Sequence, residues 1–158
     1  MEKPFEIDES LYQKLVHFYE DSYHLPPLSA KIYAYLTFDF NNNGVTFDQF
    51  IEIMKASKSS VSSSLNLLQS NGYLSTIKKI DERKRFFILN PDYVNIRFDC
   101  LMNKFKKEME ILEGLKSFRQ SSETDECSEI HISKLNIYIS LLKNNIENFS
   151  QTIKKLNQ

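Results

Sequence analysis

The segment TFDQFIEIMKASKSSVSSSLNLLQSNGYLSTIKKIDERKRFFIL, residues 46–89, carries the pattern that decides the fold. Thr46 and Gln49 have the spacing of a capping box, which predicts the start of a short apolar helix. Ser57 suits the N-cap of a second helix, predicted over Ser59–Ser70. The segment therefore opens with two helices joined by a tight turn.

Two strands are predicted after the second helix, which Asn71-Gly72 ends. They cover residues 73–77 and 85–89, with 79–84 as the tip between them. Helix, turn, helix and basic hairpin, in that order, form the outline of a winged helix-turn-helix. Such a module places its second helix in the major groove of DNA.

The predicted fold is mainly α with a small β-hairpin wing and long dimerisation helices, and the composition argues against a sheet-rich or loop-rich alternative. The chain has 158 residues, of which 41% are apolar, with only three Gly and four Pro. No apolar run approaches the ~20 residues that span a bilayer, so no membrane association is expected. The N-terminus lacks a signal-peptide core, and two cysteines make no disulfide framework or metal spacing. We therefore expect a soluble, cytoplasmic protein with reduced thiols.

Charge is distributed unevenly along the chain. The net charge is −1, yet residues 55–89 contain seven basic and two acidic side chains. A basic block inside an acidic chain suits a surface that neutralises DNA phosphates. A solvated hairpin tip would give the same composition, so charge alone leaves both interpretations open.

Two helices are predicted before this segment. Residues 8–23 form an amphipathic helix capped by Asp8, and a second helix follows Pro26-Pro27 and runs to Phe38. The polar turn after it resembles a calcium loop, beginning at Asp39, but Phe50 stands where a bidentate Glu is needed. We expect a structural turn there. The predicted domains are residues 1–24 (N-terminal helix, core and dimerisation), 25–90 (winged module) and 91–158 (helical dimerisation region).

The C-terminal region is predicted to be helical again. Phe98 to Leu112 follow 4-3-4-3 spacing, Gly114 weakens that helix near its end, and residues 119–128 are predicted to be a loop. The last helix, 132–156, carries an unbroken apolar seam that needs a partner helix, from this chain or from a second copy. We expect a homodimer. Its predicted interface residues are Leu135, Ile139, Leu142, Ile146, Phe149 and Ile153.

The second helix of the central segment has a polar face of Ser and Asn opposite Val61, Leu65 and Leu68. Small hydroxyls enter a groove without steric conflict, and Asn can bond adenine in a bidentate way. Arg and Lys of the hairpin could reach phosphates or a minor groove. The predicted DNA-binding residues are Ser57, Lys58, Ser59, Ser60, Ser62, Ser63, Asn66, Lys79, Arg83, Lys84 and Arg85. A solvent-facing polar helix and a solubilising turn are the alternatives.

Four stretches of the chain carry a family resemblance: ASKSSVSSSLNLL (56–68), GYL (72–74), DERKRFF (81–87) and LPPLSAKIYAYL (25–36). Together they resemble the MarR-type transcriptional regulators. The resemblance is strongest to the branch typified by the repressor of glycine betaine synthesis genes (GbsR-like), and covers residues 25–90. It implies a ligand-responsive, dimeric DNA-binding repressor or activator. Of the two we expect a repressor, acting on a pseudo-palindromic double-stranded operator. By that analogy residues 57–66 contact bases and residues 83–85 form the wing. Ser63 stands where many relatives place an Arg, which leaves the operator sequence open.

An effector site is a further expectation. Several aromatic rings around one cavity would suit a quaternary ammonium ligand through cation–π attraction, although core or dimer packing explains such stripes too. The candidate effector-binding residues are Tyr12, Tyr19, Tyr23, Tyr35, Phe98 and Phe105, with Tyr33 nearby.

Other chemistry is not expected. His17 and His24 have no third ligand, so no metal site is predicted, and no cofactor motif is present. A redox switch involving Cys100 or Cys127 is left open, although neither thiol has electropositive neighbours. No catalytic set can be assembled, so we expect no enzyme. The alternative function is a winged-helix protein-interaction module without DNA binding.

Overall fold

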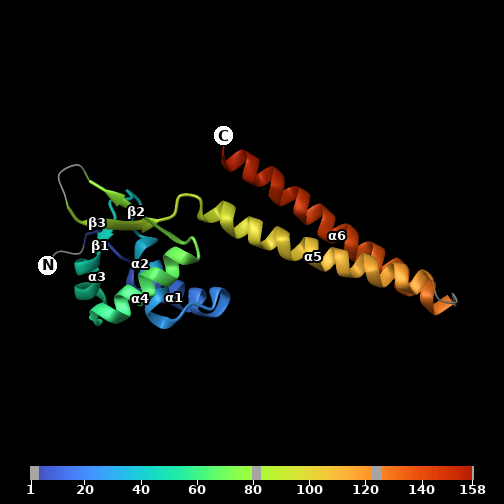
Figure 1. The fold of residues 1–158 in the computed structure, drawn as a ribbon, viewed down its shortest axis with the longest axis horizontal. Helices are drawn as coiled ribbons and strands as arrows, with labels where there is room; N and C mark the ends of the chain where they lie inside the picture. Colours follow the sequence, from blue (N-terminus) through green and yellow to red (C-terminus); the bar gives the residue numbers. More distant parts are fainter. Residues whose placement is uncertain (1–3, 80–82, 122–125, 158) are drawn as a thin grey trace. The chain divides into compact units, whose positions relative to one another are not determined.

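The computed structural model describes residues 4–79, 83–121 and 126–157, with side chains in the last range from 129 onward. The chain divides into two compact units, Met1–Tyr93 and Val94–Gln158. The first contains a helix-turn-helix and a small sheet, and the second is a pair of long helices (Figure 1). The predicted fold class, mainly α with a winged helix-turn-helix and long helices, is confirmed.

The first unit contains four helices and three strands within its described residues. In chain order they are α1 (Glu9–Tyr23), α2 (Pro27–Leu36), β1 (Val45–Thr46), α3 (Phe47–Met54), α4 (Lys58–Ser70), β2 (Leu74–Lys78) and β3 (Arg85–Leu89). Asp8 caps α1 as predicted, accepting a hydrogen bond from the Leu11 amide at 2.8 Å. The second helix begins one residue earlier than predicted, because Pro27 occupies its first turn, where a missing amide hydrogen costs nothing. It also ends two residues earlier, at Leu36.

The sheet corrects one sequence-based expectation. The sequence predicts a two-stranded hairpin, whereas the sheet has three antiparallel strands in the order β1-β3-β2. The added strand pairs Val45 with Phe87. It can approach β3 because Gly44, at φ 75°, has no side chain: a Cβ there would lie 2.8 Å from the Cβ of Phe86.

The loop before β1 is held by the buried carboxylate of Asp39. Its two oxygens accept hydrogen bonds from the amides of Asn43 at 3.0 Å and Gly44 at 2.7 Å. This arrangement is the structural turn that the sequence predicted in place of a calcium loop. The loop thereby delivers the chain to β1 at the edge of the sheet.

The helix-turn-helix is built by the caps that the sequence predicted. The Gln49 amide donates to Thr46 Oγ1 at 3.3 Å, and the Thr46 amide donates to Gln49 Oε1 at 2.8 Å, completing the capping box. Lys55 ends α3 in the left-handed conformation, with φ 51°. Ser57 caps α4, which begins at Lys58, one residue before the predicted start.

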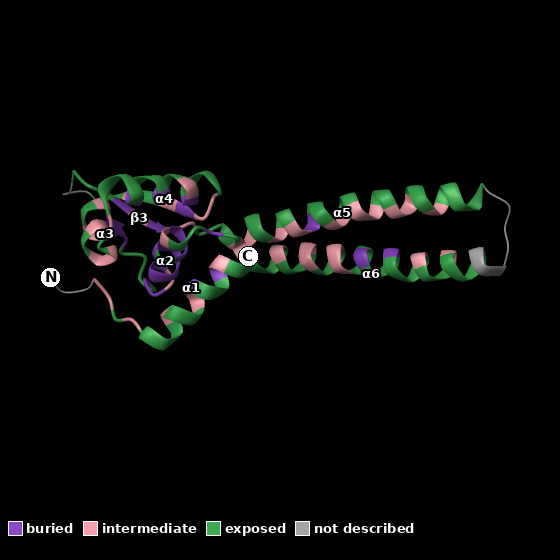
Figure 2. Cartoon of the chain, turned by 90° about the horizontal axis from the view of Figure 1, so that it is seen from below, coloured by how far each residue is buried: buried purple, intermediate pink, exposed green. Residues whose placement is uncertain are grey.

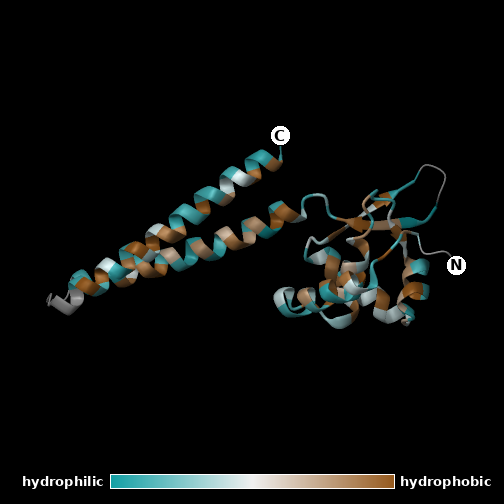
Figure 3. Cartoon of the chain, turned by 180° about the vertical axis from the view of Figure 1, so that it is seen from behind, coloured by the Kyte–Doolittle hydropathy of each residue, from teal (hydrophilic) through white to brown (hydrophobic). Residues whose placement is uncertain are grey.

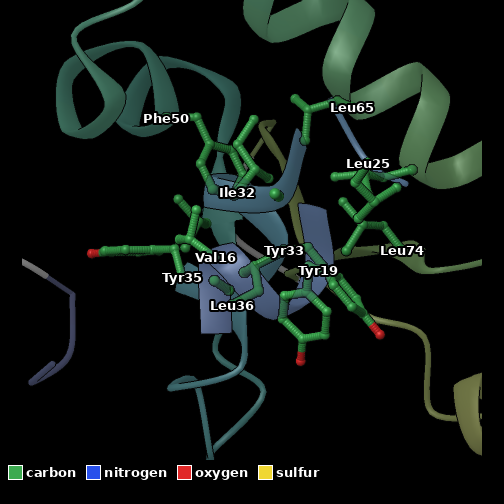
Figure 4. Packing of buried hydrophobic residues seen from close by; sticks show 14 of the residues in the cluster. Val16, Tyr19, Leu25, Ile32, Tyr33, Tyr35, Leu36, Phe50, Leu65 and Leu74 are labelled. Carbon is green, nitrogen blue, oxygen red and sulfur yellow. The ribbon is translucent and has the colours of Figure 1, made fainter. Parts of the chain in front are cut away.

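A single apolar core joins these elements. Tyr33 and Tyr35 of α2, Phe50 of α3 and Leu65 of α4 are at most 2% exposed. Figure 4 shows side chains from α1, α2, α3 and α4 meeting around the central helix α2. Because α4 is fixed on this core by one side, its opposite side is presented outward in a defined orientation.

The second unit is an antiparallel hairpin of α5 (Tyr93–Gln120) and α6 (Glu126–Leu156). The Phe149 ring lies 5.0 Å from that of Phe98 and 6.1 Å from that of Phe105, measured between centroids. Near the middle of the two helices, Tyr138 Oη donates to Glu108 Oε1 at 2.7 Å. Figure 2 shows the buried and half-buried residues of the two helices on the sides that face each other.

The hairpin settles how the C-terminal seam is covered within one chain. Of the two partners left open by the sequence, α5 of the same chain covers this seam, where Ile139 and Leu142 are 3% exposed. The predicted loop over 119–128 was too long, because α5 continues through Gln120 and α6 begins at Glu126. Gly114 does not end α5. No helix in the described ranges combines the length and apolarity that a bilayer crossing requires.

Candidate nucleic-acid interface

Helix α4 is two-sided. Val61, Leu65 and Leu68 are at most 2% exposed and anchor it to α2 and the core. Ser64 is buried beside them. Helical spacing predicts this anchoring, which directs the remaining serines and Asn66 to solvent.

Every polar residue predicted to contact DNA from this helix region is exposed: Ser57, Lys58, Ser59, Ser60, Ser62, Ser63 and Asn66. They differ in their hydrogen bonds. The Ser57 hydroxyl accepts from the Ser60 amide at 3.2 Å and lies 3.0 Å and 2.9 Å from the hydroxyls of Ser59 and Ser60. Ser62, Ser63 and Asn66 make no side-chain hydrogen bond to another described residue. Their donors and acceptors are therefore available to a ligand.

The hairpin supplies positive charge beside this helix. Lys78 pairs with Arg85 across β2 and β3, and Arg83, Lys84 and Arg85 are all exposed. The Lys79 ammonium lies 4.1 Å from the centre of the Phe86 ring, a cation–π contact that fixes its stem on the sheet. Asp81 and Glu82 of the predicted tip lie outside the described residues.

One contact was missed by the sequence analysis. Lys84 Nζ lies 3.1 Å from Asp48 Oδ2, so the hairpin is tied to α3 by an exposed ion pair. The two residues are 36 positions apart, and no local pattern links them. Lys84, predicted to contact DNA, therefore has a carboxylate partner within the chain.

Asp48 and Lys84 line an open hollow of about 680 Å³ between α3, the start of α4 and the sheet. Lys58 and Glu52 line it too, so two cations and two carboxylates share it. The Thr46, Gln49, Ile51 and Phe86 side chains complete the lining. The carboxylates reduce the positive potential beside α4, which sets a limit on the attraction of this surface for phosphate.

The predicted effector residues fall into separate groups. Tyr19 and Tyr23 pack with Tyr33 and Tyr73, with ring centroids 4.6–6.3 Å apart. Burial raises the pKa of Tyr33 well above its ordinary value, and the neighbouring tyrosines add to this shift. The Tyr33 hydroxyl therefore stays protonated at physiological pH, and its ring packs against those of Tyr19, Tyr23 and Tyr73.

Tyr12 and Tyr35 form a second group with Phe5. The Tyr35 ring lies 4.7 Å from that of Phe5. Burial raises the pKa of Tyr35 to about 12, and Tyr12 and Asp39 add to the shift. The remaining candidates, Phe98 and Phe105, belong to the second unit, where both contact Phe149.

The other candidate groups have local roles. His17 Nδ1 lies 3.6 Å from Glu20 on α1. Cys100 is an exposed free thiol, and the Cys127 side chain lies outside the described residues. Among the residues that the structure describes, no cluster of His, Cys, Asp and Glu could hold a metal ion.

Comparison with solved structures relates the fold to known proteins. A crystal structure of a transcriptional regulator matches with a TM-score of 0.51 and 13% identity, covering 90% of this chain and 97% of that one. MepR, a transcription regulator of the Staphylococcus aureus multidrug efflux pump MepA, matches with a TM-score of 0.43 and 15% identity, covering 84% of this chain and 90% of its own. A mutant of MepR, from a multidrug-resistant S. aureus clinical isolate, matches with a TM-score of 0.42 and 16% identity. The match covers 87% of this chain and 99% of that one.

The sequence comparisons give no closer relationship. No protein-family model matches the chain, and no curated protein matches it. At 13% identity the first structural match concerns the fold, and it extends over nearly the whole of both chains. The chain therefore shares its fold with a transcriptional regulator.

Proposed function

We propose that this chain is a MarR-type transcriptional regulator that binds double-stranded DNA in a sequence-specific way. The observation that carries the proposal is the exposed Ser and Asn face of α4, held in a fixed orientation by Val61, Leu65 and Leu68. A polar helix face of small side chains, beside a basic hairpin, suits entry into a major groove. The resemblance in residues 25–90 favours the GbsR-like branch of that family.

The residues divide by role. Ser62, Ser63 and Asn66 make no side-chain hydrogen bond within the described part of the chain and would contact base edges, with Asn66 suited to adenine. Lys58, Arg83 and Arg85 are exposed cations that would contact phosphates and position the helix. The Ser57 hydroxyl bonds to the hydroxyls of Ser59 and Ser60, so these three serines would shape the start of α4 more than they would read sequence.

The active form in this proposal is a cytoplasmic homodimer on a pseudo-palindromic operator. A two-fold dimer presents two copies of α4 about one DNA turn apart, ~34 Å or a multiple of it. We further propose that it represses transcription and responds to a small-molecule effector. The candidate ligand class is a quaternary ammonium compound, with aromatic rings of the first unit as its contacts.

A fluorescence-anisotropy titration on the DNA upstream of the chain's own gene tests the proposal. Binding should weaken steeply with salt, with a log–log slope near −0.9 per phosphate neutralised. The double change Arg83→Ala, Arg85→Ala should flatten that slope and weaken all sequences alike. The matched control is Lys14→Ala, Lys31→Ala, which removes two exposed cations from α1 and α2. Equal slopes for the two double variants would remove the hairpin from the interface.

Sequence reading is tested separately. Asn66→Ala should cost about 1–3 kcal/mol on the preferred site and little on random DNA, because a bidentate base contact is lost. Gln69→Ala, an exposed amide on the flank of the same helix, is the control. Absence of binding even at low salt would favour the alternative, a protein-interaction module. Asp48 and Glu52 beside α4 would suit that alternative, since both repel phosphate.

A further inference from the structure

Two of the three glycines in the chain directly follow an asparagine, at Asn43-Gly44 and Asn71-Gly72. Each glycine has a positive φ, 75° at Gly44 and 74° at Gly72, which suits a residue without a side chain. An asparagine before a glycine is also prone to spontaneous deamidation, because glycine leaves its own backbone nitrogen unshielded. The two steps therefore share one reactivity, and the fold around each decides whether the reaction proceeds.

The reaction is a cyclisation followed by a hydrolysis. The glycine nitrogen loses its proton and bonds to the side-chain carbonyl carbon of the asparagine, and the side-chain nitrogen takes up a proton and leaves as ammonia. Water then opens the cyclic imide at either carbonyl, which gives aspartate or isoaspartate. The first step requires the glycine N–H to leave its hydrogen bond. It also requires the asparagine backbone to rotate until the glycine nitrogen lies beside the asparagine side chain.

The hydrogen bonds of the loop before β1 oppose this step at Asn43. The Gly44 amide donates to Asp39 Oδ2 at 2.7 Å, and the Asn43 amide donates to Asp39 Oδ1 at 3.0 Å. Asp39 is only 7% exposed, so an anionic nitrogen at Gly44 would face a negative charge with little water to screen it. The buried carboxylate therefore disfavours both the loss of the proton and the rotation.

Packing on the sheet holds the same glycine in place. Gly44 is buried beside β3, which is apolar along most of its length (Figure 3). A Cβ at Gly44 would lie 2.8 Å from Phe86 Cβ, so the glycine backbone is already close to the strand. Rotation at Asn43 would draw Gly44 away from β3 and strain the adjacent pairing of Val45 with Phe87. Asn43 is therefore protected even though it is exposed.

The Asn71-Gly72 step is held more weakly. Asn71 is the exposed C-cap of α4, with φ −84° and ψ 2°. The Gly72 amide donates to the Gln69 carbonyl oxygen at 2.9 Å, a bond in the last turn of the helix. Helix ends fray, so such a bond opens at low cost. Residues 53–80 contain no Asp or Glu, so no carboxylate nearby in the sequence opposes an anionic nitrogen there.

Deamidation at Asn71 would alter the joint between α4 and the hairpin. The Tyr73 amide donates to the Leu68 carbonyl oxygen at 2.9 Å. The Gly72 carbonyl oxygen accepts from Asn90 Nδ2 at 2.8 Å, which ties the joint to the end of β3. Isoaspartate would add a methylene to the backbone within this joint. Either product would place a carboxylate at the C-terminal end of α4, where the helix dipole disfavours negative charge.

We propose that Asn71 is a site of spontaneous covalent modification, deamidated by water in the folded protein, whereas Asn43 is protected by Asp39 and β3. Asn71 then accumulates aspartate and isoaspartate with time, and the joint between α4 and the hairpin changes as the protein ages. This modification requires no DNA and is independent of the proposed function.

Ageing the full chain in mildly alkaline heavy-oxygen water tests the proposal, because each deamidated residue gains one labelled oxygen. Peptide mass spectrometry then gives the rates at both asparagines in one sample. In the folded protein Asn71 should react roughly tenfold faster than Asn43 or more, a difference of about 1.4 kcal/mol in activation free energy. In urea, where only local sequence counts, the two rates should be similar. Equal rates in the folded protein, a faster Asn43, or the same ratio in urea would each overturn the proposal.

A variant of the protecting carboxylate tests the cause of the difference. Asp39→Asn removes the charge that faces the Gly44 amide. The rate at Asn43 should rise several-fold towards its rate in urea, while the rate at Asn71 stays unchanged and serves as the internal control. An Asn43 that stays as slow as in the wild type would overturn the role assigned to Asp39.

DNA titrations separate the modification from the proposed function. Asn71→Asp copies one product and should bind DNA more weakly than Asn71→Gln, which keeps an amide and removes the reactivity. Aged wild type should lose affinity, whereas aged Asn71→Gln should bind like fresh protein. Fresh wild type that binds no DNA, while Asn71 still deamidates, would refute the proposed function and support the modification site. Unchanged affinity after conversion of Asn71 would refute the effect on the joint.

Discussion

Gly44→Ala should destabilise the first unit strongly, because this position has neither the conformation nor the space for a side chain. Its φ is 75°, in the left-handed region. An added Cβ would lie 2.8 Å from Phe86 Cβ, 3.0 Å from Ile88 Cγ2 and 3.2 Å from the Phe87 carbonyl oxygen. The first and third of these atoms are fixed by the backbone of β3, so a rotamer change cannot relieve the contacts.

The expected magnitude combines two effects. A non-glycine residue in the left-handed conformation costs about 1–2 kcal/mol. Forcing a methyl group into a packed region costs about 1–3 kcal/mol, because β1 must shift away from β3. We therefore expect the free energy of unfolding to fall by about 2–5 kcal/mol, a large part of the stability of a small domain.

Urea unfolding followed by tyrosine fluorescence reports on the first unit, where Gly44 lies. The chain has no Trp, and seven of its eight Tyr lie in residues 1–93. Asn41→Ala, an exposed change in the same loop, is the control and should shift stability by less than ~0.5 kcal/mol. A Gly44→Ala protein as stable as that control would refute the close packing of β1 on β3.

Three further predictions concern single residues of the first unit. Asp48→Asn frees Lys84 from its ion pair and removes a charge that repels phosphate. Anisotropy titrations should therefore show several-fold tighter DNA binding for this variant. Asp21→Asn, an exposed change on α1, is the control and should leave DNA affinity unchanged. Because that pair is exposed, its loss should change the free energy of unfolding by under ~1 kcal/mol. Burial raises the pKa of Tyr35 to about 12, so the folded state keeps a proton that the unfolded state loses near pH 10. Stability should therefore fall as pH rises from about 10 to 12, and urea midpoints should fall less steeply there in Tyr35→Phe; an unchanged decline would show that other groups cause it. Thr46→Ala removes the capping box of α3 and should cost about 1 kcal/mol in urea unfolding, whereas Thr76→Ala on the exposed side of β2 should cost less.

Local patterns in the sequence are sufficient to predict most elements of the chain. The Thr46–Gln49 capping box, the Ser57 cap and the Asp8 cap each depend on residues within four positions of one another. The burial of Val61, Leu65 and Leu68 follows from helical spacing alone. The same spacing predicts the exposed Ser and Asn face of α4, because those residues occupy the opposite side of the helix.

Boundaries and short elements are predicted less well. Strand β1 has only two residues, and Thr46 also caps α3, so no period-two pattern could reveal it. The predicted loop at 119–128 was too long because polar residues suit an exposed helix as well as a loop. Gly114 predicts a weakened helix end, yet a 28-residue helix packed along a partner continues through one glycine.

By itself the sequence determined the helix-turn-helix, its caps, the side of α4 that faces solvent and the need of the C-terminal seam for a partner. Each follows from interactions within one turn or one strand, which neighbouring residues specify. Only the tertiary structure decided that α5 covers the seam, that Asp48 pairs with Lys84 and that Gly44 admits β1 to the sheet. These contacts join residues far apart in the chain. Local sequence patterns do not specify such contacts, because which surfaces meet depends on how the whole core packs.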